Sequence, residues 1–152
     1  MDKIIEKRIY LEPKYLDSQI KEHILNKLKE LTKNECTKDH GHILSINKII
    51  NITSVEDTIF NVKMEVKTFK PEENMEINGT ICMLYKDGIF VNIYDKQKLL
   101  IPAGNAKNYV FDDENGYYIS GDKKLKVGNE INIRIIASKY RNHSFSCIGT
   151  IV

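Results

Sequence analysis

The sequence predicts two small domains in tandem, an α+β domain of strand, helix, strand and strand in residues 1–75 and an all-β barrel in residues 76–152. Apolar residues follow a helical repeat only in the first half of the chain, and only short strands and turns follow Met75. Between the halves, an alternating strand starts at Phe60 and stops at Pro71, because proline cannot donate a hydrogen bond to a β-ladder. We therefore expect the domain boundary near residue 75.

The composition fits a globular protein without a strong preference for polyanions. Of the 152 residues, 41% are hydrophobic, and 23 basic against 21 acidic residues leave a formal net charge of +2. This near balance argues against strong non-specific binding of nucleic acid, so any such contact has to come from a local patch. Two domains of about 75 residues are marginally stable alone, and they gain stability from each other or from a partner.

The N-terminal residues and the cysteines predict an intracellular protein. Residues Met1–Lys7 are too charged for a signal peptide, and no apolar run is long enough to span a membrane. The cysteines are scattered and form no Cys-x-x-Cys pair: Cys36, Cys82 and Cys147. We expect these cysteines to be reduced thiols buried as small core residues, in a protein that has no membrane partner.

In the first domain, the pattern predicts a helix that lies on a sheet. Strands are expected at Lys3–Leu11 and His42–Asn51, with a turn at Glu12–Tyr15. Between them, Asp17 or Ser18 caps a helix. Its apolar face consists of Ile20, Ile24, Leu28 and Leu31. The second strand presents Ile43, Ile46 and Ile49, and the polar segment Thr53–Asp57 leads into the last strand, whose inward residues are Phe60, Val62, Met64 and Val66.

The second domain is predicted as a five-stranded Greek-key barrel of the OB type. The expected strands are Ile77–Leu84, Ile89–Tyr94, Lys98–Pro102, Ile131–Ala137 and Phe145–Val152. Within the second of them, alternation turns Ile89, Val91 and Ile93 inward. One long polar connection, Ala103–Lys126, follows the third strand. Short strands with one long connection are typical of this barrel.

The sequence offers no catalytic motif. It contains no Gly-rich phosphate loop, no nucleophile elbow and no His-Glu-x-x-His helix. His40 and His42 lie close to Cys36, but their spacing matches no recognised zinc pattern. We therefore expect no enzyme activity, no metal and no cofactor.

Aromatic and basic residues of the barrel predict a surface for single-stranded nucleic acid. Phe90 and Tyr94 occupy the polar side of their strand, where an exposed aromatic ring stacks on unpaired bases. Basic side chains and one more aromatic lie in neighbouring turns: Lys86, Lys139, Tyr140 and Arg141. An alternative interpretation is that Phe90 packs beneath the long connection or against the first domain, and the pattern leaves both open.

Motifs along nearly the whole chain resemble one known family. They include Leu11-x-Pro13-x-Tyr15, Cys36 ahead of Gly41-His42-Ile43, Phe60-Asn61-Val62-Lys63 with Phe69-Lys70-Pro71, Gly79, Gly88-Ile89-Phe90-Val91, Leu100-Ile101-Pro102, Val127-Gly128 and Ile148-Gly149. In this order and spacing, they resemble the larger stalk subunit of archaeal and eukaryotic DNA-directed RNA polymerases, in particular the seventh subunit of RNA polymerase II.

The resemblance implies a tip domain followed by an S1-type OB barrel, in a non-catalytic stalk subunit. It implies three partners: the large polymerase core subunits, a smaller helical stalk subunit and, weakly, nascent single-stranded RNA. The core contact is expected at the tip: Ile50, Asn51, Ile52, Thr53 and Ser54. The chain departs from the family in a shorter tip loop, Ile50–Ile59, and in Ile101, where the S1 pattern often has histidine.

The resemblance also implies a location and leaves one competing function. A cellular member is expected in the nucleus, and a viral member, consistent with the lysine, isoleucine and asparagine bias, in a cytoplasmic viral factory or the virion. The alternative is a free-standing S1-type RNA-binding protein of translation or RNA decay.

Overall fold

A computed structural model describes all residues, 1–152, and divides the chain into two compact units, Met1–Lys70 and Pro71–Val152. The division comes earlier than the boundary expected near residue 75. Asn74 N–H donates to the Ile135 carbonyl (2.7 Å), and Ile135 N–H donates to the Met75 carbonyl (2.8 Å). These two hydrogen bonds attach the segment after Pro71 to the second unit. No helix in the structure has both the length and the apolar character needed to cross a membrane.

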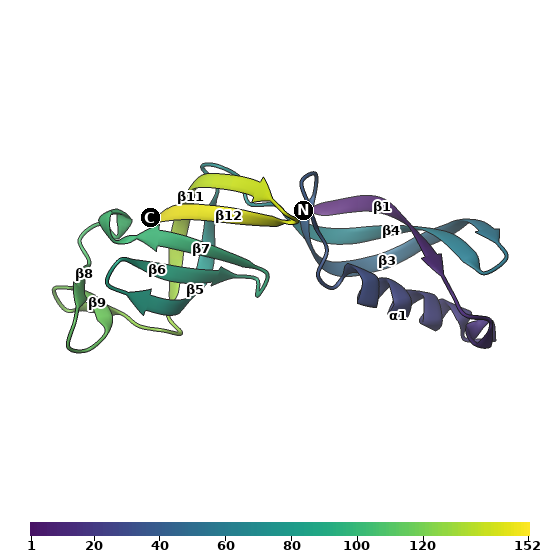
Figure 1. Cartoon of the computed structure of the whole chain (residues 1–152), viewed down its shortest axis with the longest axis horizontal. Coiled ribbons are helices and arrows are strands. Elements are labelled where there is room, and N and C mark those ends of the chain that lie inside the picture. Colours follow the sequence, from purple (N-terminus) through teal and green to yellow (C-terminus); the bar gives the residue numbers. More distant parts are fainter. The chain divides into compact units, whose positions relative to one another are not determined.

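The first unit is a four-stranded antiparallel sheet with one helix along one side (Figure 1). The strands, in sheet order, are β1 (Asp2–Tyr10), β4 (Ile59–Phe69), β3 (Gly41–Glu56) and β2 (Cys36–Thr37). The 3₁₀ turn η1 (Pro13–Tyr15) and the helix α1 (Ile20–Thr32) connect β1 to β2. Leu11 N–H donates to the Thr58 carbonyl (2.9 Å), so the chain entering η1 lies against the end of the β3–β4 hairpin.

The core of this unit follows the predicted alternation with one exception. Phe60, Val62, Met64 and Val66 are all buried, and Ile24 and Leu28 of α1 pack on them. Leu31, expected on the apolar face of the helix, is 49% exposed, and Thr32 is buried in its place. Thr32 can be buried because its hydroxyl donates to the Leu28 carbonyl (2.8 Å). The predicted cap, Asp17 or Ser18, was wrong: the N-cap of α1 is Gln19, which makes no side-chain capping hydrogen bond, and Asp17 Oδ1 accepts from Gln19 N–H (2.9 Å) before the helix begins.

Strand β3 is longer than expected, and it bulges at a regular interval. The polar segment Thr53–Asp57 was expected to be a connection, but β3 continues to Glu56 and pairs with β4 to the end. Its register shifts at Ile43/Ser45, Ile46/Lys48, Ile49/Asn51 and Ile52/Ser54, so three residues of β3 face two of β4 each time. Ile43, Ile46, Ile49 and Ile52 therefore return to one face at every third position.

The second unit is a closed five-stranded barrel, which confirms the predicted OB-type fold. Its strands are β5 (Glu76–Tyr85), β6 (Gly88–Ile93), β7 (Gln97–Pro102), β11 (Glu130–Arg141) and β12 (Ser144–Ile151), closed in the order β11-β12-β7-β6-β5. Ile89, Val91 and Ile93 point inward and are fully buried, as predicted. At Gly79 a Cβ would lie 2.4 Å from Val91 Cγ1, so only glycine fits there.

The long polar connection between β7 and β11 contains strands of its own, which were not predicted from the sequence. It contains the 3₁₀ turn η2 (Ala103–Asn105) and a separate three-stranded sheet, β8 (Val110–Asp112), β9 (Tyr117–Ser120) and β10 (Lys123–Leu125), in the order β10-β9-β8. Tyr118 is 1% exposed, and its hydroxyl donates to the carbonyls of Tyr85 (2.5 Å) and Lys86 (3.2 Å) in the β5–β6 turn. We call this sheet the insert.

Candidate nucleic-acid interface

The outside of the barrel carries a continuous row of apolar side chains across all five strands. Met83 on β5 pairs with Phe90 on β6, and Phe90 pairs in turn with Leu100 on β7. Leu100 pairs with Ile148 on β12, and Ile148 pairs with Ala137 on β11. Met83 is 36% exposed and Ile148 40%, so the row is open to solvent at several points. An apolar row of this extent on a barrel surface indicates a binding face.

A polar row with two lysines runs beside the apolar row. Asn92 pairs with Lys98 across β6 and β7, and Ser146 pairs with Lys139 across β12 and β11. The two rows, apart from Met83 and Asn92, line a groove of about 540 Å³ formed by Phe90, Lys98, Leu100, Ala137, Ser138, Lys139, Phe145, Ser146, Cys147 and Ile148. We call it the barrel groove. An aromatic ring with two ammonium groups beside it is the arrangement that holds a single nucleic-acid strand by stacking and charge.

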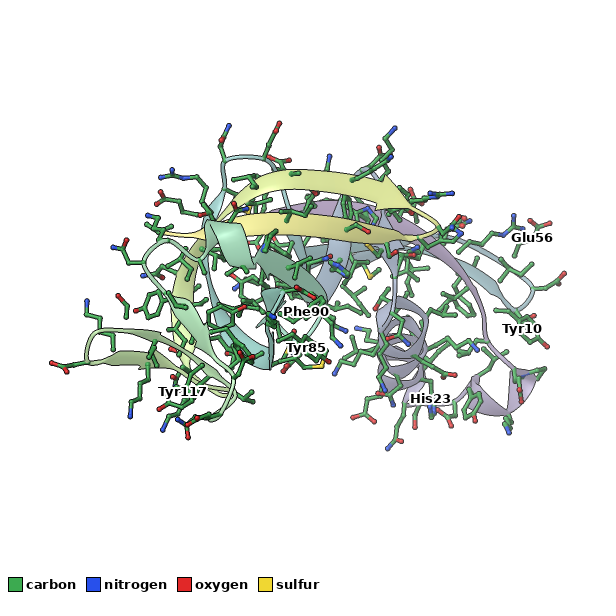
Figure 2. The ribbon with its side chains drawn as sticks, turned by 60° about the vertical axis from the view of Figure 1, so that its left-hand side comes forward. Tyr10, His23, Glu56, Tyr85, Phe90 and Tyr117 are labelled. Carbon is green, nitrogen blue, oxygen red and sulfur yellow. The ribbon has the colours of Figure 1, made fainter.

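Phe90 is half-buried at the wall of this groove. Its ring meets the ring of Tyr85 edge-on, with centroids 6.0 Å apart, and Figure 2 shows the two side chains next to each other on the barrel. No residue of the connection Ala103–Lys126 lines the groove. Within the second unit, Phe90 therefore lies at an open surface and not beneath that connection.

The other residues predicted for RNA contact are distributed differently. Lys139 lines the groove with Phe90, whereas Lys86 is exposed in the β5–β6 turn and Arg141 is exposed at the end of β11. Tyr94 was expected on the outer face of the strand, but β6 ends at Ile93 and Tyr94 occupies the following turn with a φ of 55°. Tyr140 is half-buried, and its ring packs edge-to-face on Phe145 with centroids 4.9 Å apart.

Sequence reasoning found only Phe90 and Lys139 among the residues that line the groove and missed the others, including Lys98 and Ile148. Both lie on strands that had been located correctly, but their place beside Phe90 depends on the pairing between β6, β7 and β12. The alternation of β7 did carry a signal, because buried Leu99 and Ile101 leave Lys98 and Leu100 on the outer face.

A second, smaller groove lies on the first unit, where the core contact was expected. Ile50, Asn51 and Ile52 line it together with Lys21, Ile24 and Ile49, and its volume is about 330 Å³. Ile50 and Ile52 are 39% and 38% exposed. Thr53 and Ser54 are held within the sheet, since the Thr53 hydroxyl donates to Glu6 Oε1 (2.6 Å) and Ser54 Oγ accepts from Asn61 Nδ2 (2.6 Å). We call this the tip groove.

The histidines and cysteines near β2 form two separate contacts. Cys36 Sγ lies 3.8 Å from His42 Nε2, and the Glu35 carboxylate is bonded by Lys7 Nζ and lies 3.3 Å from His40 Nε2. Cys36 and Cys147 are buried as expected, while Cys82 is half-buried. Burial raises the pKa of the Cys147 thiol, which disfavours the reactive thiolate in the barrel groove.

Comparison with known families assigns both units. Residues 70–147, more than half of the chain, match the model described as "S1 RNA binding domain". Residues 6–60 match the one described as "SHS2 domain found in N terminus of Rpb7p/Rpc25p/MJ0397". The chain belongs to the family of the larger RNA polymerase stalk subunit. The predicted succession of a tip domain and an S1 barrel is thereby confirmed.

Relatives in this family match almost the whole chain. The chain is 24% identical to "DNA-directed RNA polymerase II subunit RPB7" of Glycine max and 25% identical to "DNA-directed RNA polymerase II subunit 7" of Arabidopsis thaliana. Each alignment spans 97% of this chain and 89% of the relative. A viral protein, 250L of Invertebrate iridescent virus 6, is 25% identical over 97% of this chain and 94% of its own. Proteins from plants and from a virus thus match this chain over most of their length.

A solved structure, Mycoplasma genitalium RNase R, resembles part of the chain. The match covers 53% of this chain and 13% of that enzyme, with a TM-score of 0.44 and 16% identity. A likeness of this size carries no information about activity.

Proposed function

We propose that the chain is a non-catalytic stalk subunit of a multisubunit DNA-directed RNA polymerase, which docks on the core through its tip and contacts nascent RNA through its barrel. The observation that carries the proposal is the pairing of two family domains in one chain, an Rpb7-type tip domain and an S1 barrel. The alignments with the two relatives named as polymerase II subunits span both of these domains. The test of the whole proposal is co-purification of the tagged chain with the large polymerase subunits at moderate salt.

The tip groove supports the docking part of the proposal. Ile50 and Ile52 expose apolar surface beside Ile49 and Ile24 although a monomer gains nothing from leaving it uncovered. A protein partner that inserts an apolar side chain there removes this surface from water. We assign that role to the polymerase core, and a smaller helical stalk subunit is the second proposed protein partner.

The barrel groove supports the RNA part of the proposal. Phe90 provides a stacking ring, and Lys98 and Lys139 provide positive charge along one side. Lys86 in the β5–β6 turn and Arg141 at the end of β11 remain predicted phosphate contacts, and Tyr94 and Tyr140 remain predicted stacking residues. With few cations and mostly aliphatic neighbours, this face favours weak binding that tolerates any sequence.

Replacing Phe90 with alanine is expected to weaken binding of single-stranded RNA without changing its salt dependence. One stacked base contributes about 1–3 kcal/mol, and no charge is removed. Fluorescence anisotropy of a labelled oligouridine across a salt series measures both quantities. Tyr10→Ala serves as the control, since Tyr10 is an aromatic residue of the first unit and is 55% exposed. If Phe90→Ala unfolds the barrel, the residue is part of the core.

Replacing Lys98 and Lys139 together with alanine is expected to flatten the salt dependence instead. Each lost phosphate contact lowers the slope of log K against log salt by about 0.7 for a single strand, so the pair removes about 1.4. Affinity falls equally for all RNA sequences. The matched control is the double variant of Lys29 and Lys63, two exposed lysines of the first unit. An unchanged slope in the barrel variant would place the RNA elsewhere.

The location follows from the family. We propose the nucleus for a cellular member, and a viral factory or virion for a member related to the iridescent virus protein. The competing function, a free-standing S1-type RNA-binding protein, gives the tip groove no role. That protein would bind RNA fully without partners, whereas a stalk subunit binds weakly alone.

A further inference from the structure

The insert has two faces of opposite character. Phe111, Tyr118 and Leu125 occupy one face, where Tyr118 and Leu125 are buried and the rings of Phe111 and Tyr118 lie 5.3 Å apart. The Tyr118 hydroxyl attaches this face to the β5–β6 turn, because it donates to the carbonyls of Tyr85 and Lys86. Burial raises the pKa of Tyr118, so the hydroxyl stays protonated and remains a donor. The insert is therefore a fixed part of the barrel and not a loose loop.

The other face presents an aromatic ring between lysines. Lys124 Nζ lies 5.3 Å and Lys126 Nζ 5.5 Å from the centroid of the Tyr117 ring. Both lysines are exposed, and so is Val110 at 67% in the neighbouring strand. Tyr117 is half-buried and lies on the face opposite to Tyr118, whose side chain supplies the anchoring contacts.

Charge on the insert is separated along the strands. Asp112 ends β8 and Asp113 and Glu114 lie in the β8–β9 turn, whereas Lys123 and Lys124 lie on β10 and Lys126 comes directly after it. Asp112 pairs with Tyr117 in register, but its carboxylate is engaged by Asn115 Nδ2 (2.8 Å) and by the backbone N–H groups of Glu114 (3.0 Å) and Asn115 (3.3 Å). These hydrogen bonds lower the pKa of Asp112. A polyanion on this face is therefore expected to follow β10 and avoid the β8–β9 turn.

We infer that Tyr117, Lys124 and Lys126 form a second contact for single-stranded RNA, which extends the path of the strand beyond the barrel groove. The ligand is a phosphate backbone on the two ammonium groups with one base stacked on Tyr117. This inference rests on the proposed function of the barrel groove.

Continuity between the two surfaces favours RNA over an acidic protein segment. Phe90 contacts Tyr85 edge-on, and the backbone of Tyr85 and Lys86 accepts the Tyr118 hydroxyl on the underside of the insert. The exposed side chain of Lys86 lies in this same turn. An RNA strand that runs from Phe90 toward the insert therefore passes a third cation, Lys86, before it reaches Tyr117. Figure 2 shows the three aromatic residues Phe90, Tyr85 and Tyr117 on the second unit.

Two RNA lengths separate the two contacts. Single OB barrels occupy about 4 to 16 nucleotides. The full-length chain is titrated with oligouridines of about 4 and about 16 nucleotides, first alone and then in the purified polymerase complex. Tyr117→Ala is expected to weaken binding of the longer RNA by about 5-fold to 150-fold and to leave the shorter RNA unchanged. Tyr117→Phe keeps a stacking ring and is expected to bind both RNAs as the wild type does.

The lysines have their own readout and a matched control. Lys124→Ala with Lys126→Ala is expected to flatten the salt slope for the longer RNA by about 1.4, from two lost phosphate contacts. Lys123→Ala removes the same charge from the same strand, but Lys123 alternates with Lys124 and belongs to the opposite face. We expect this control to leave the slope unchanged.

Each outcome supports or overturns the inference. If Tyr117→Ala and the double lysine variant bind the longer RNA normally while Phe90→Ala is impaired, the insert is not an RNA contact and the proposed function stands. If Phe90→Ala is also without effect, the proposed function fails as well. If the double lysine variant loses a protein subunit from the complex with RNA binding unchanged, the face is a protein contact and the inference is wrong.

Discussion

Replacing Ile50 and Ile52 together with aspartate is expected to release the protein from the polymerase core while its fold stays intact. Both side chains line the tip groove and are more than a third exposed, so the free protein tolerates a polar replacement. In the docked protein, each new carboxylate would be buried without a partner, which costs several kcal/mol. Because every 1.4 kcal/mol is a factor of ten in the dissociation constant, the loss exceeds about a hundredfold. Co-purification with tagged core subunits measures it.

Ile4→Asp is the matched control for this experiment. Ile4 is an isoleucine of the same sheet and is 59% exposed, but it pairs with Glu65 on the face away from α1. The new aspartate lies opposite Glu65, and the two like charges repel each other. The control therefore also tests whether an added carboxylate on this sheet lowers stability enough to prevent assembly. We expect the control to assemble normally. Assembly of the Ile50 and Ile52 double variant would show that the core docks at another surface.

Replacing Gly41 with alanine is expected to destabilise the first unit strongly. Gly41 opens β3 with a φ of +72°, and a Cβ there would lie 2.3 Å from the Phe69 carbonyl oxygen and 2.6 Å from Lys70 Cα. Both contacts are with backbone, which no rotamer change can relieve. We expect a loss of about 2–4 kcal/mol, a large share of the stability of a domain of this size. Amide hydrogen exchange of β3 and β4 measures the loss residue by residue.

Gly104→Ala is the control for that substitution. A Cβ on Gly104, in η2, meets no atom within 4 Å and its φ is not in the left-handed region, so the fold is expected to be unaffected. In the Gly41→Ala variant, faster exchange is expected in the first unit, with the barrel strands unchanged. Equal acceleration in β6 and β7 would mean that the two compact units unfold together.

Much of the fold was predictable because local patterns and burial agree. The alternation from Phe60 to Val66 and from Ile89 to Ile93 fixed which faces are buried, and the structure buries those residues. The patterns failed to predict burial where tertiary contacts decide which side chain is buried. Leu31 satisfies the helical repeat but remains exposed, whereas Thr32 is buried and bonds its hydroxyl to the Leu28 carbonyl.

The candidate site was predictable only in part, for a different reason. Phe90 could be identified from one strand alone, but the groove around it depends on registers that join β6 to β7 and β7 to β12. The strands of the insert could not be predicted because of its composition. Its acidic turn and lysines resemble a solvated loop, and the apolar side that gives it structure consists of isolated residues, Phe111, Tyr118 and Leu125, rather than a run.

The bulges of β3 constrain how the tip of this protein can evolve. Since three residues of β3 face two of β4 in each interval, an insertion of a single residue in either strand would rotate every later isoleucine away from α1. The hairpin can lengthen without such a rotation by repeating its own unit of three residues in β3 and two in β4, or by adding regular pairs of residues to both strands. Reach toward a partner therefore changes in steps of several residues shared between the two strands, and relatives with tips of different length are expected to differ by such steps and not by single residues.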